Sequence, residues 1–130
     1  MYRVMSIEAL DILIGEGLDV NRRDRDGFPP IARAAKHSHG YIEAITALIA
    51  RGADVRKPTR DGQTALGFLI AKGGPEANRG IRLILDAYSK LITDPEDLQI
   101  FQETANLHTI DHLMKNSYRA SRHKWYNVFV

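Results

Sequence analysis

Two segments recur in the chain at a spacing of 35 residues, and this repeat constrains the fold more than any other feature. The stretch LIGEGLDVN at 13–21 matches LIARGADVR at 48–56, and each contains an apolar pair, a glycine and an Asp-Val pair. DRDGFPPIARAA at 24–35 matches TRDGQTALGFLI at 59–70 in the same way. Because both segments recur in the same order, the chain is a tandem repeat whose units bury a common core by stacking.

The repeated unit resembles the ankyrin repeat, a roughly 33-residue unit of a β-turn, two antiparallel helices and a loop. Its signature D-x-x-G-x-T-P-L-H-x-A-A is similar to the segments that contain Gly27 and Gly62, and L-L-x-x-G-A-D-V-N is similar to those that contain Gly17 and Gly52. The match covers roughly residues 7–90 well and the remainder weakly. The resemblance implies an all-α fold, a short ankyrin-repeat solenoid of stacked helix-turn-helix units with β-turn fingers and degenerate terminal caps.

The period of 35 residues exceeds the ankyrin period because the segments between paired helices, 36–41 and 72–80, are long. We expect both to be loops, since loops tolerate insertions. The apolar residues that follow each segment recur at helical spacing and are predicted core stripes: Ile42, Ile45 and Leu48-Ile49 in one helix, and Ile81, Ile84 and Leu85 in the other. Leu48 and Leu85 take the buried leucine position of a second helix. We predict few strands, and helices at roughly 6–15, 30–37, 41–50, 64–72, 77–89, 95–105 and 107–116.

Counting back from Gly17, Met1 falls inside a repeat, so the first repeat is partial. This start fits either a fragment of a longer chain or a shortened native cap formed by residues 1–6. We expect one ankyrin-repeat domain, 1–116, and a basic-aromatic capping tail, 117–130. The domain comprises a partial repeat 1–23, repeats 24–58 and 59–90, and a degenerate capping repeat 91–116.

The capping repeat is predicted from helix-start signals. Thr93 or Asp94 can cap a helix that has Pro95 in its first turn. The spacing from Leu98 to the pair Leu113-Met114 equals the consensus spacing between the first and second helices of an ankyrin repeat.

The tail SYRASRHKWYNVFV at 117–130 mixes Arg and Lys with aromatic residues. This composition fits three roles: covering the open end of the core, contacting a partner, or binding single-stranded nucleic acid. We favour the first role, because the apolar residues of a tail that follows the last repeat can cover exposed core.

The composition is that of an ordinary globular protein, with 44% apolar residues, 26% charged residues and a formal net charge of +2. No stretch approaches the roughly 18 consecutive apolar residues of a membrane helix, and the first residues lack the apolar core of a signal peptide. We expect a cytoplasmic protein with no membrane partner, or one delivered into a host cell if it is part of an effector. The absence of Cys excludes disulfides and thiolate chemistry.

Few residues have the spacing of catalytic or metal-binding groups. His108 and His112 lie four apart on a predicted helix, and His37 and His39 lie in a predicted loop, but two imidazoles make half a metal site. Gly73-Gly74 precedes Pro75 and lacks the Lys-Ser/Thr pair of a phosphate loop. We therefore expect no enzyme activity, no cofactor, no metal and no small-molecule substrate.

The concave side that the resemblance implies is rich in basic side chains. Its turn tips and helix starts carry seven basic residues and three acidic ones, Asp24, Asp26 and Asp61. Such charges also solvate turns in any protein, and Phe28 could pack against the neighbouring finger, but Arg beside an aromatic ring is typical of interface hot spots. The predicted partner-binding residues are Arg22, Arg23, Arg25, Phe28, Lys36, His37, Arg56, Lys57, Arg60, Gln63 and Lys72.

The resemblance implies a non-enzymatic protein-protein interaction module whose partner has an acidic docking surface. The module would be either the docking domain of a larger protein, such as a bacterial effector, or a stand-alone inhibitor or immunity-type protein. A nucleic-acid-binding adaptor that uses the fingers and the tail is the alternative function, although the small net charge disfavours it. A structural homo-oligomer is a third class.

Overall fold

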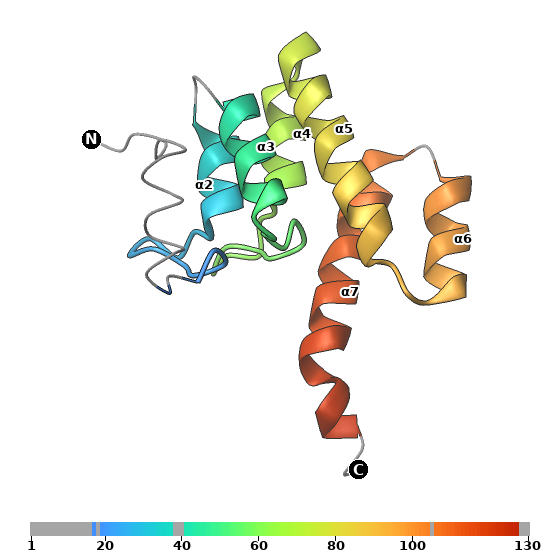
Figure 1. Cartoon of the computed structure of the whole chain (residues 1–130). Helices are drawn as coiled ribbons and strands as arrows, with labels where there is room; N and C mark the ends of the chain where they lie inside the picture. Colours follow the sequence, from blue (N-terminus) through green and yellow to red (C-terminus); the bar gives the residue numbers. More distant parts are fainter. Residues whose placement is uncertain (1–16, 18, 38–40, 105, 128–130) are drawn as a thin grey trace.

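The computed structural model describes residues 17, 19–37, 41–104 and 106–127, of which 119–127 are described by their backbone alone. Every regular element in these ranges is an α-helix, so the predicted all-α class is confirmed there; the helix predicted at 6–15 lies outside them. The helices, shown in Figure 1, are α2 (Pro30–Lys36), α3 (Tyr41–Ala50), α4 (Ala65–Lys72), α5 (Gly74–Leu91), α6 (Pro95–Glu103) and α7 (Leu107–Asn127).

The four central helices form two rows. The helices α2 and α4 pack side by side, α3 packs on α2, and α5 packs on both α3 and α4 (Figure 1). The 35-residue spacing is the reason, because α2 and α4 occupy equivalent positions in consecutive units, as do α3 and α5.

Helix starts follow from local sequence. Helix α2 begins at Pro30, where the absent N–H of proline costs no hydrogen bond. At α4 the Thr64 side chain accepts a hydrogen bond from the Gly67 N–H, and at α6 the Asp94 side chain accepts one from the Glu96 N–H. These signals explain why the predicted starts of α2, α4 and α6 lie within one residue of the observed starts, and the predicted starts of α3 and α7 are also within one residue.

The segment 72–80 is not the loop that the sequence predicted. Helix α4 ends at Lys72, Gly73 alone joins it to α5, and α5 starts at Gly74 and continues for 18 residues. Gly73 makes the sharp junction possible with φ +68, and Pro75 and Glu76 are both favourable in a first helical turn. The inserted residues therefore lengthen the second helix.

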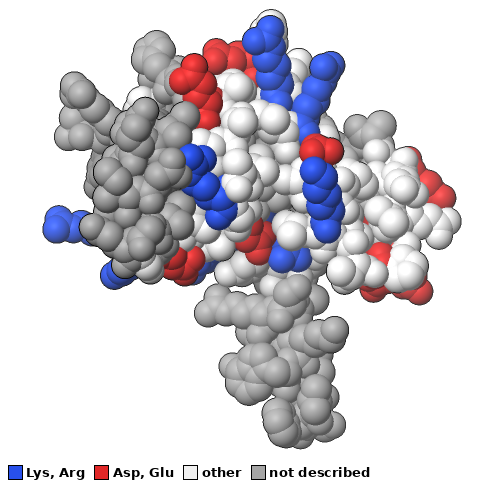
Figure 2. All heavy atoms as spheres, viewed as in Figure 1, with Lys and Arg blue, Asp and Glu red and all other residues white. Residues whose placement is uncertain are grey.

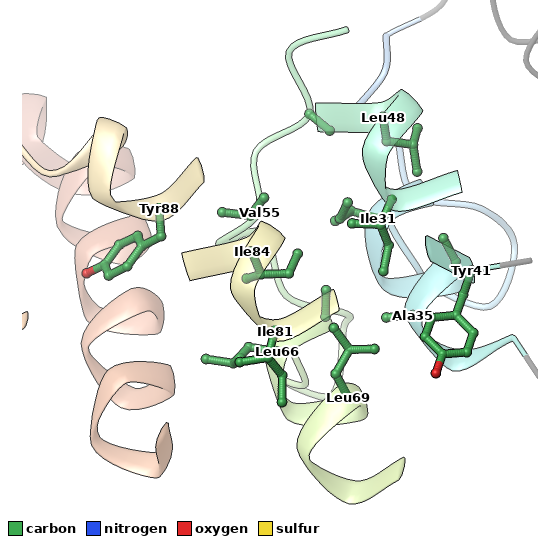
Figure 3. Packing of buried hydrophobic residues seen from close by; sticks show 14 of the residues in the cluster. Ile31, Ala35, Tyr41, Leu48, Val55, Leu66, Leu69, Ile81, Ile84 and Tyr88 are labelled. Carbon is green, nitrogen blue, oxygen red and sulfur yellow. The ribbon is translucent and has the colours of Figure 1, made fainter. Parts of the chain in front are cut away.

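The core lies between the two rows of helices. Figure 3 shows Leu66 and Leu69 of α4 beside Ile81 and Ile84 of α5 in this interior. Ile84 is fully buried and Leu85 only partly so, which corrects the prediction that Leu85 takes the buried position. Ile81 and Ile84 of the predicted stripe are both buried, so the correction concerns Leu85 alone.

The two repeated turns are equivalent, as predicted. Gly27 and Gly62 have φ values of +83 and +82, and their N–H groups donate to the backbone carbonyls of Asp24 and Thr59 at the same distance, 3.0 Å. A left-handed backbone of this kind favours glycine because it has no Cβ.

The C-terminal helices do not continue the order of the repeats. The sequence placed Leu98 on a first helix and Leu113-Met114 on a second, but α7 is the helix that packs on α4, where a following first helix would lie. Helix α6 instead contacts α7, and its Phe101 ring meets the Tyr88 ring of α5 edge-on, with centroids 5.5 Å apart. The order of the two helices is thus exchanged relative to the two rows.

The backbone at 117–127 continues α7 and is not separate from it. Figure 1 shows this end of α7 extending past the other helices. In the part of the chain that the structure describes, every helix falls short of the length or the apolar content that a membrane span requires.

Candidate functional site

The predicted binding residues lie on two turns, 19–28 and 54–63, and on the adjoining helices α2 and α4; we call this region the finger surface. The turns are joined by hydrogen bonds between residues about one repeat apart. The Arg60 N–H donates to the Gly27 carbonyl at 3.1 Å, and the Asp54 N–H donates to the Asn21 side-chain carbonyl at 2.7 Å. The finger surface is therefore one continuous structure and not two independent loops.

Asp24 organises the first turn. Its carboxylate accepts hydrogen bonds from the N–H groups of Asp26 and Phe28, both at 3.0 Å, and forms an ion pair with Arg33 at 2.9 Å. Burial by itself would raise the pKa of Asp24, but the bonds from Phe28, Arg33 and Asp26 outweigh it and lower the pKa. Asp24 is thus held as a carboxylate, and the turn it caps is stable at neutral pH.

Phe28 lies at the centre of the finger surface. Its ring stacks on Phe68 of α4, with centroids 5.7 Å apart and planes 18° apart. The guanidinium carbon of Arg33 lies 4.2 Å from the Phe28 centroid, and the Lys36 ammonium lies 4.9 Å from it. Both residues are half-buried, so each packs against the protein and keeps part of its surface accessible.

Four of the predicted cations bind the protein itself. Arg23 donates two hydrogen bonds to the Pro58 carbonyl, at 2.8 and 3.1 Å, and Lys57 donates to the Asn21 carbonyl. Arg56 pairs with Asp54 at 3.0 Å and donates to the Ser117 hydroxyl. The fourth cation is Lys72.

Lys72 closes the C-terminal end of α2. Its ammonium donates to the carbonyls of Ala35 and His37 and lies 4.1 Å from the centroid of the Tyr41 ring. Burial lowers the pKa of Lys72, although Glu76 partly offsets this effect. His37 is half-buried and receives this bond through its backbone, so the structure gives both residues a role in ending the helix.

The other predicted polar residues are exposed. Arg22, Arg25, Lys36, Arg60 and Gln63 are all exposed, and no carboxylate of the described residues forms an ion pair with the four cations. Their charges are therefore available to a partner.

Two functional candidates were missed in the sequence. Arg33 of α2 and Phe68 of α4 occupy equivalent positions 35 residues apart, and both side chains contact the Phe28 ring. The repeat register was the signal that could have identified them, because it places both one helical turn after the start of a first helix.

The remaining polar groups offer little chemistry. His108 and His112 are exposed on α7, where the His112 ring nitrogen lies 3.2 Å from the Asn116 amide nitrogen. Within the described ranges no three His, Asp or Glu side chains gather as metal ligands would. Asp111 is engaged by the Thr64 hydroxyl and by Lys115, the latter at 3.0 Å.

The charge distribution differs between the ends of the molecule. Figure 2 shows acidic and basic side chains mixed over the face that carries α3 and α5, whereas the charged side chains at the α6 end are acidic. This follows from the sequence, since no Lys or Arg lies between Lys90 and Lys115. The cations of the finger surface that lack a carboxylate partner among the described residues all lie earlier in the sequence, between Arg22 and Arg60.

No family model matches the chain, and no curated protein matches its sequence. The function is therefore argued from the finger surface itself.

Proposed function

We propose that the protein is a small ankyrin-repeat module, without enzyme activity, that binds an acidic surface of a partner protein through its finger surface. The observation that carries the proposal is the set of exposed cations without a carboxylate partner among the described residues, grouped around a half-buried pair of aromatic rings. Arg and aromatic residues dominate the energetics of protein interfaces.

The assignment to the ankyrin class is supported by two further features. The 35-residue sequence repeat coincides with equivalent turns at Gly27 and Gly62, and α2 and α4 pack side by side with α3 and α5 in a second row. The exchanged positions of α6 and α7 are compatible with a degenerate cap.

The exposed cations and the rings have different roles in this proposal. Arg25 and Arg60 are exposed at the turn tips, so they attract an acidic partner over distances of about a Debye length, roughly 8 Å at physiological salt. Phe28 is held against Phe68 and forms the contact that slows dissociation.

The test is affinity capture from cells that express the protein, with wild type and the double variant Arg25→Glu/Arg60→Glu as baits. The matched control is Arg79→Glu/Arg82→Glu, which makes the same charge change on the exposed face of α5. We expect a protein that is retained by wild type and by the control and is lost from the double variant. Capture of the same proteins by all three baits contradicts the proposal.

Surface plasmon resonance with the captured partner then separates the two roles. The double variant should slow association, and high salt should reduce its difference from wild type. Phe28→Ala should instead speed dissociation at any salt concentration. Unchanged melting of each variant is the control for folding.

A further inference from the structure

We propose that the partner presents an acidic segment with an aromatic side chain, and that this ring packs on the exposed edges of Phe28 and Phe68 while its flanking carboxylates meet Lys36 and Arg60. The inference rests on the proposed function and specifies the chemistry of the partner.

The first support is the platform that the two rings form. Phe28 and Phe68 come from different repeats, and their rings stack with planes only 18° apart. Both rings are half-buried, so the platform is anchored in the protein and still accessible. A third ring can pack on it edge-on or offset, the arrangements that aromatic pairs prefer.

The second support is that the platform is rigid before a partner binds. Arg33 lies over the Phe28 ring and pairs with both Asp24 and Asp26, at 2.9 and 2.8 Å. These contacts fix the ring and the guanidinium together. A rigid platform reduces the side-chain entropy that a complex loses when it forms.

The third support is the charge on either side of the platform. Arg33 is already neutralised by two carboxylates, but the Lys36 ammonium, 4.9 Å from the Phe28 centroid, has no carboxylate partner among the described residues. The Arg60 side chain lies against Gly27, next to Phe28, and within the described ranges its guanidinium donates only to the Arg25 carbonyl, at 3.5 Å. Two uncompensated cations therefore flank the rings, and carboxylates are the groups that complement them.

The acidic side chains of the same turns favour a peptide over a nucleic acid. Asp61 is exposed at the tip of its turn, where it would repel the continuous phosphate backbone of a nucleic acid. Asp26 is also exposed, but its charge is paired with Arg33. A short acidic segment can place its carboxylates at Lys36 and Arg60 and avoid both aspartates.

The test measures fluorescence anisotropy of three labelled peptides with the full chain. One peptide has tryptophan flanked by glutamates, the second replaces tryptophan by alanine, and the third replaces the glutamates by lysines. We expect the acidic tryptophan peptide to bind about tenfold more tightly than the acidic alanine peptide. The lysine peptide should show no binding.

Variants locate the binding. Phe28→Leu and Phe68→Leu should each remove most of the tryptophan advantage, whereas Phe101→Leu, which removes a half-buried ring on α6, should leave it intact. Lys36→Gln and Arg60→Gln should weaken both acidic peptides by a similar factor, and Arg82→Gln on α5 is the matched control. Circular dichroism melts establish that each variant is folded.

Four outcomes overturn the inference. The first is equal binding of the two acidic peptides, and the second is a tryptophan advantage that survives Phe28→Leu and Phe68→Leu. The third is no binding of any peptide at millimolar concentration. The fourth is displacement of the peptide by a single-stranded oligonucleotide whose binding depends on Phe28. The capture experiment distinguishes the two proposals. A partner lost from Arg25→Glu/Arg60→Glu but bound normally by Phe28→Leu contradicts this inference and the role proposed for Phe28, and leaves the acidic docking surface in place. A partner retained by both variants contradicts the proposed function.

Discussion

At the residue scale, Gly27 and Gly62 share one backbone conformation but have different surroundings. A Cβ at Gly27 would lie 2.6 Å from the Arg60 Cγ, whereas a Cβ at Gly62 would meet nothing within 4 Å. Any other residue at either position also bears the strain of a positive φ. Comparing substitutions at the two glycines therefore distinguishes the cost of backbone strain, which both share, from the cost of displacing Arg60, which only Gly27 bears.

Substituting alanine at each glycine tests this difference. We expect Gly62→Ala to lower the free energy of unfolding by about 1 kcal/mol, and Gly27→Ala to lower it by about 2 kcal/mol because Arg60 must also move. Urea denaturation measures both values. Equal losses would show that Arg60 moves aside without cost.

The same scale shows what the sequence could not specify about the candidate site. The sequence identified Phe28 and the exposed cations from their positions after the repeated glycines. It could not show that Arg23, Lys57 and Lys72 donate to backbone carbonyls 35 to 37 residues away, because those bonds depend on how the units stack. Basic composition alone does not distinguish a cation that binds a partner from one that holds two repeats together.

At the element scale, alanine substitutions test which residues of α3 and α5 are buried in the core. Leu48 of α3 and Ile84 of α5 are buried, with 5% and 0% of their surface exposed, whereas Leu85 is only partly buried. We expect Leu48→Ala and Ile84→Ala each to lower the free energy of unfolding by about 2 to 5 kcal/mol, and Leu85→Ala to lower it by about 1 to 2 kcal/mol. If chemical denaturation shows that Leu85→Ala lowers the free energy of unfolding most, Leu85 occupies the buried position that the sequence predicted for it.

A polar contact joins α7 to α4 beside the buried side chains of Ile110 and Met114. The Thr64 hydroxyl, which is buried and accepts a hydrogen bond from the Gly67 N–H, donates to the Asp111 carboxylate. Asp111→Ala leaves that hydroxyl without its acceptor and should cost about 1 to 3 kcal/mol.

Hydrogen exchange measures the consequence, since amide protection should fall in α7 and persist in α2 and α3. The control is Asp86→Ala, which removes an exposed i,i+4 pair with Lys90 and should cost less than about 0.5 kcal/mol. A comparable loss in both variants would show that the Thr64 contact contributes no more than a surface charge.

Helix boundaries were predictable where local chemistry sets them and were not where packing does. Pro30, Thr64 and Pro95 mark their helix starts in the sequence because each fixes or caps the first turn. Gly73-Gly74 indicates a loop by composition, yet α5 extends back to Gly74. The exchange of α6 and α7 was also unpredictable, because spacing along a chain does not determine the side on which a helix packs.

At the scale of the whole molecule, the junction of α5 and α6 makes stability sensitive to alkaline pH. Among the described residues the buried Tyr88 hydroxyl has no partner within hydrogen-bond distance. Burial and the charge of Asp97 raise the pKa of Tyr88 to about 12, although Ser117 and Arg56 act in the opposite direction. The folded protein therefore keeps a proton that the unfolded chain loses above the ordinary pKa of 10. The stabilisation is complete below pH 10 and is lost as the pH rises toward 12.

Tyr88→Phe tests this dependence. We expect the variant to be at least as stable as wild type at pH 7, since it removes a buried hydroxyl without a partner, and to lose less stability between pH 10 and 12. Burial also raises the pKa of Tyr41, so a shallower decline should remain. Thermal melts across this pH range measure the stability of both proteins, with Tyr118→Phe as the control. If the stability of all three proteins falls in parallel, groups other than Tyr88 cause the pH dependence.

The position of α7 also determines where the protein could gain length. Because α7 occupies the side of α4 on which a further unit would stack, a unit appended after the last helix would find no surface to join. A 35-residue unit duplicated between residues 58 and 59 would instead meet a like neighbour on both sides and add one more turn to the row of fingers. Insertion of a unit among the repeats is therefore the route by which such a chain could widen its recognition surface while α6 and α7 keep their packing.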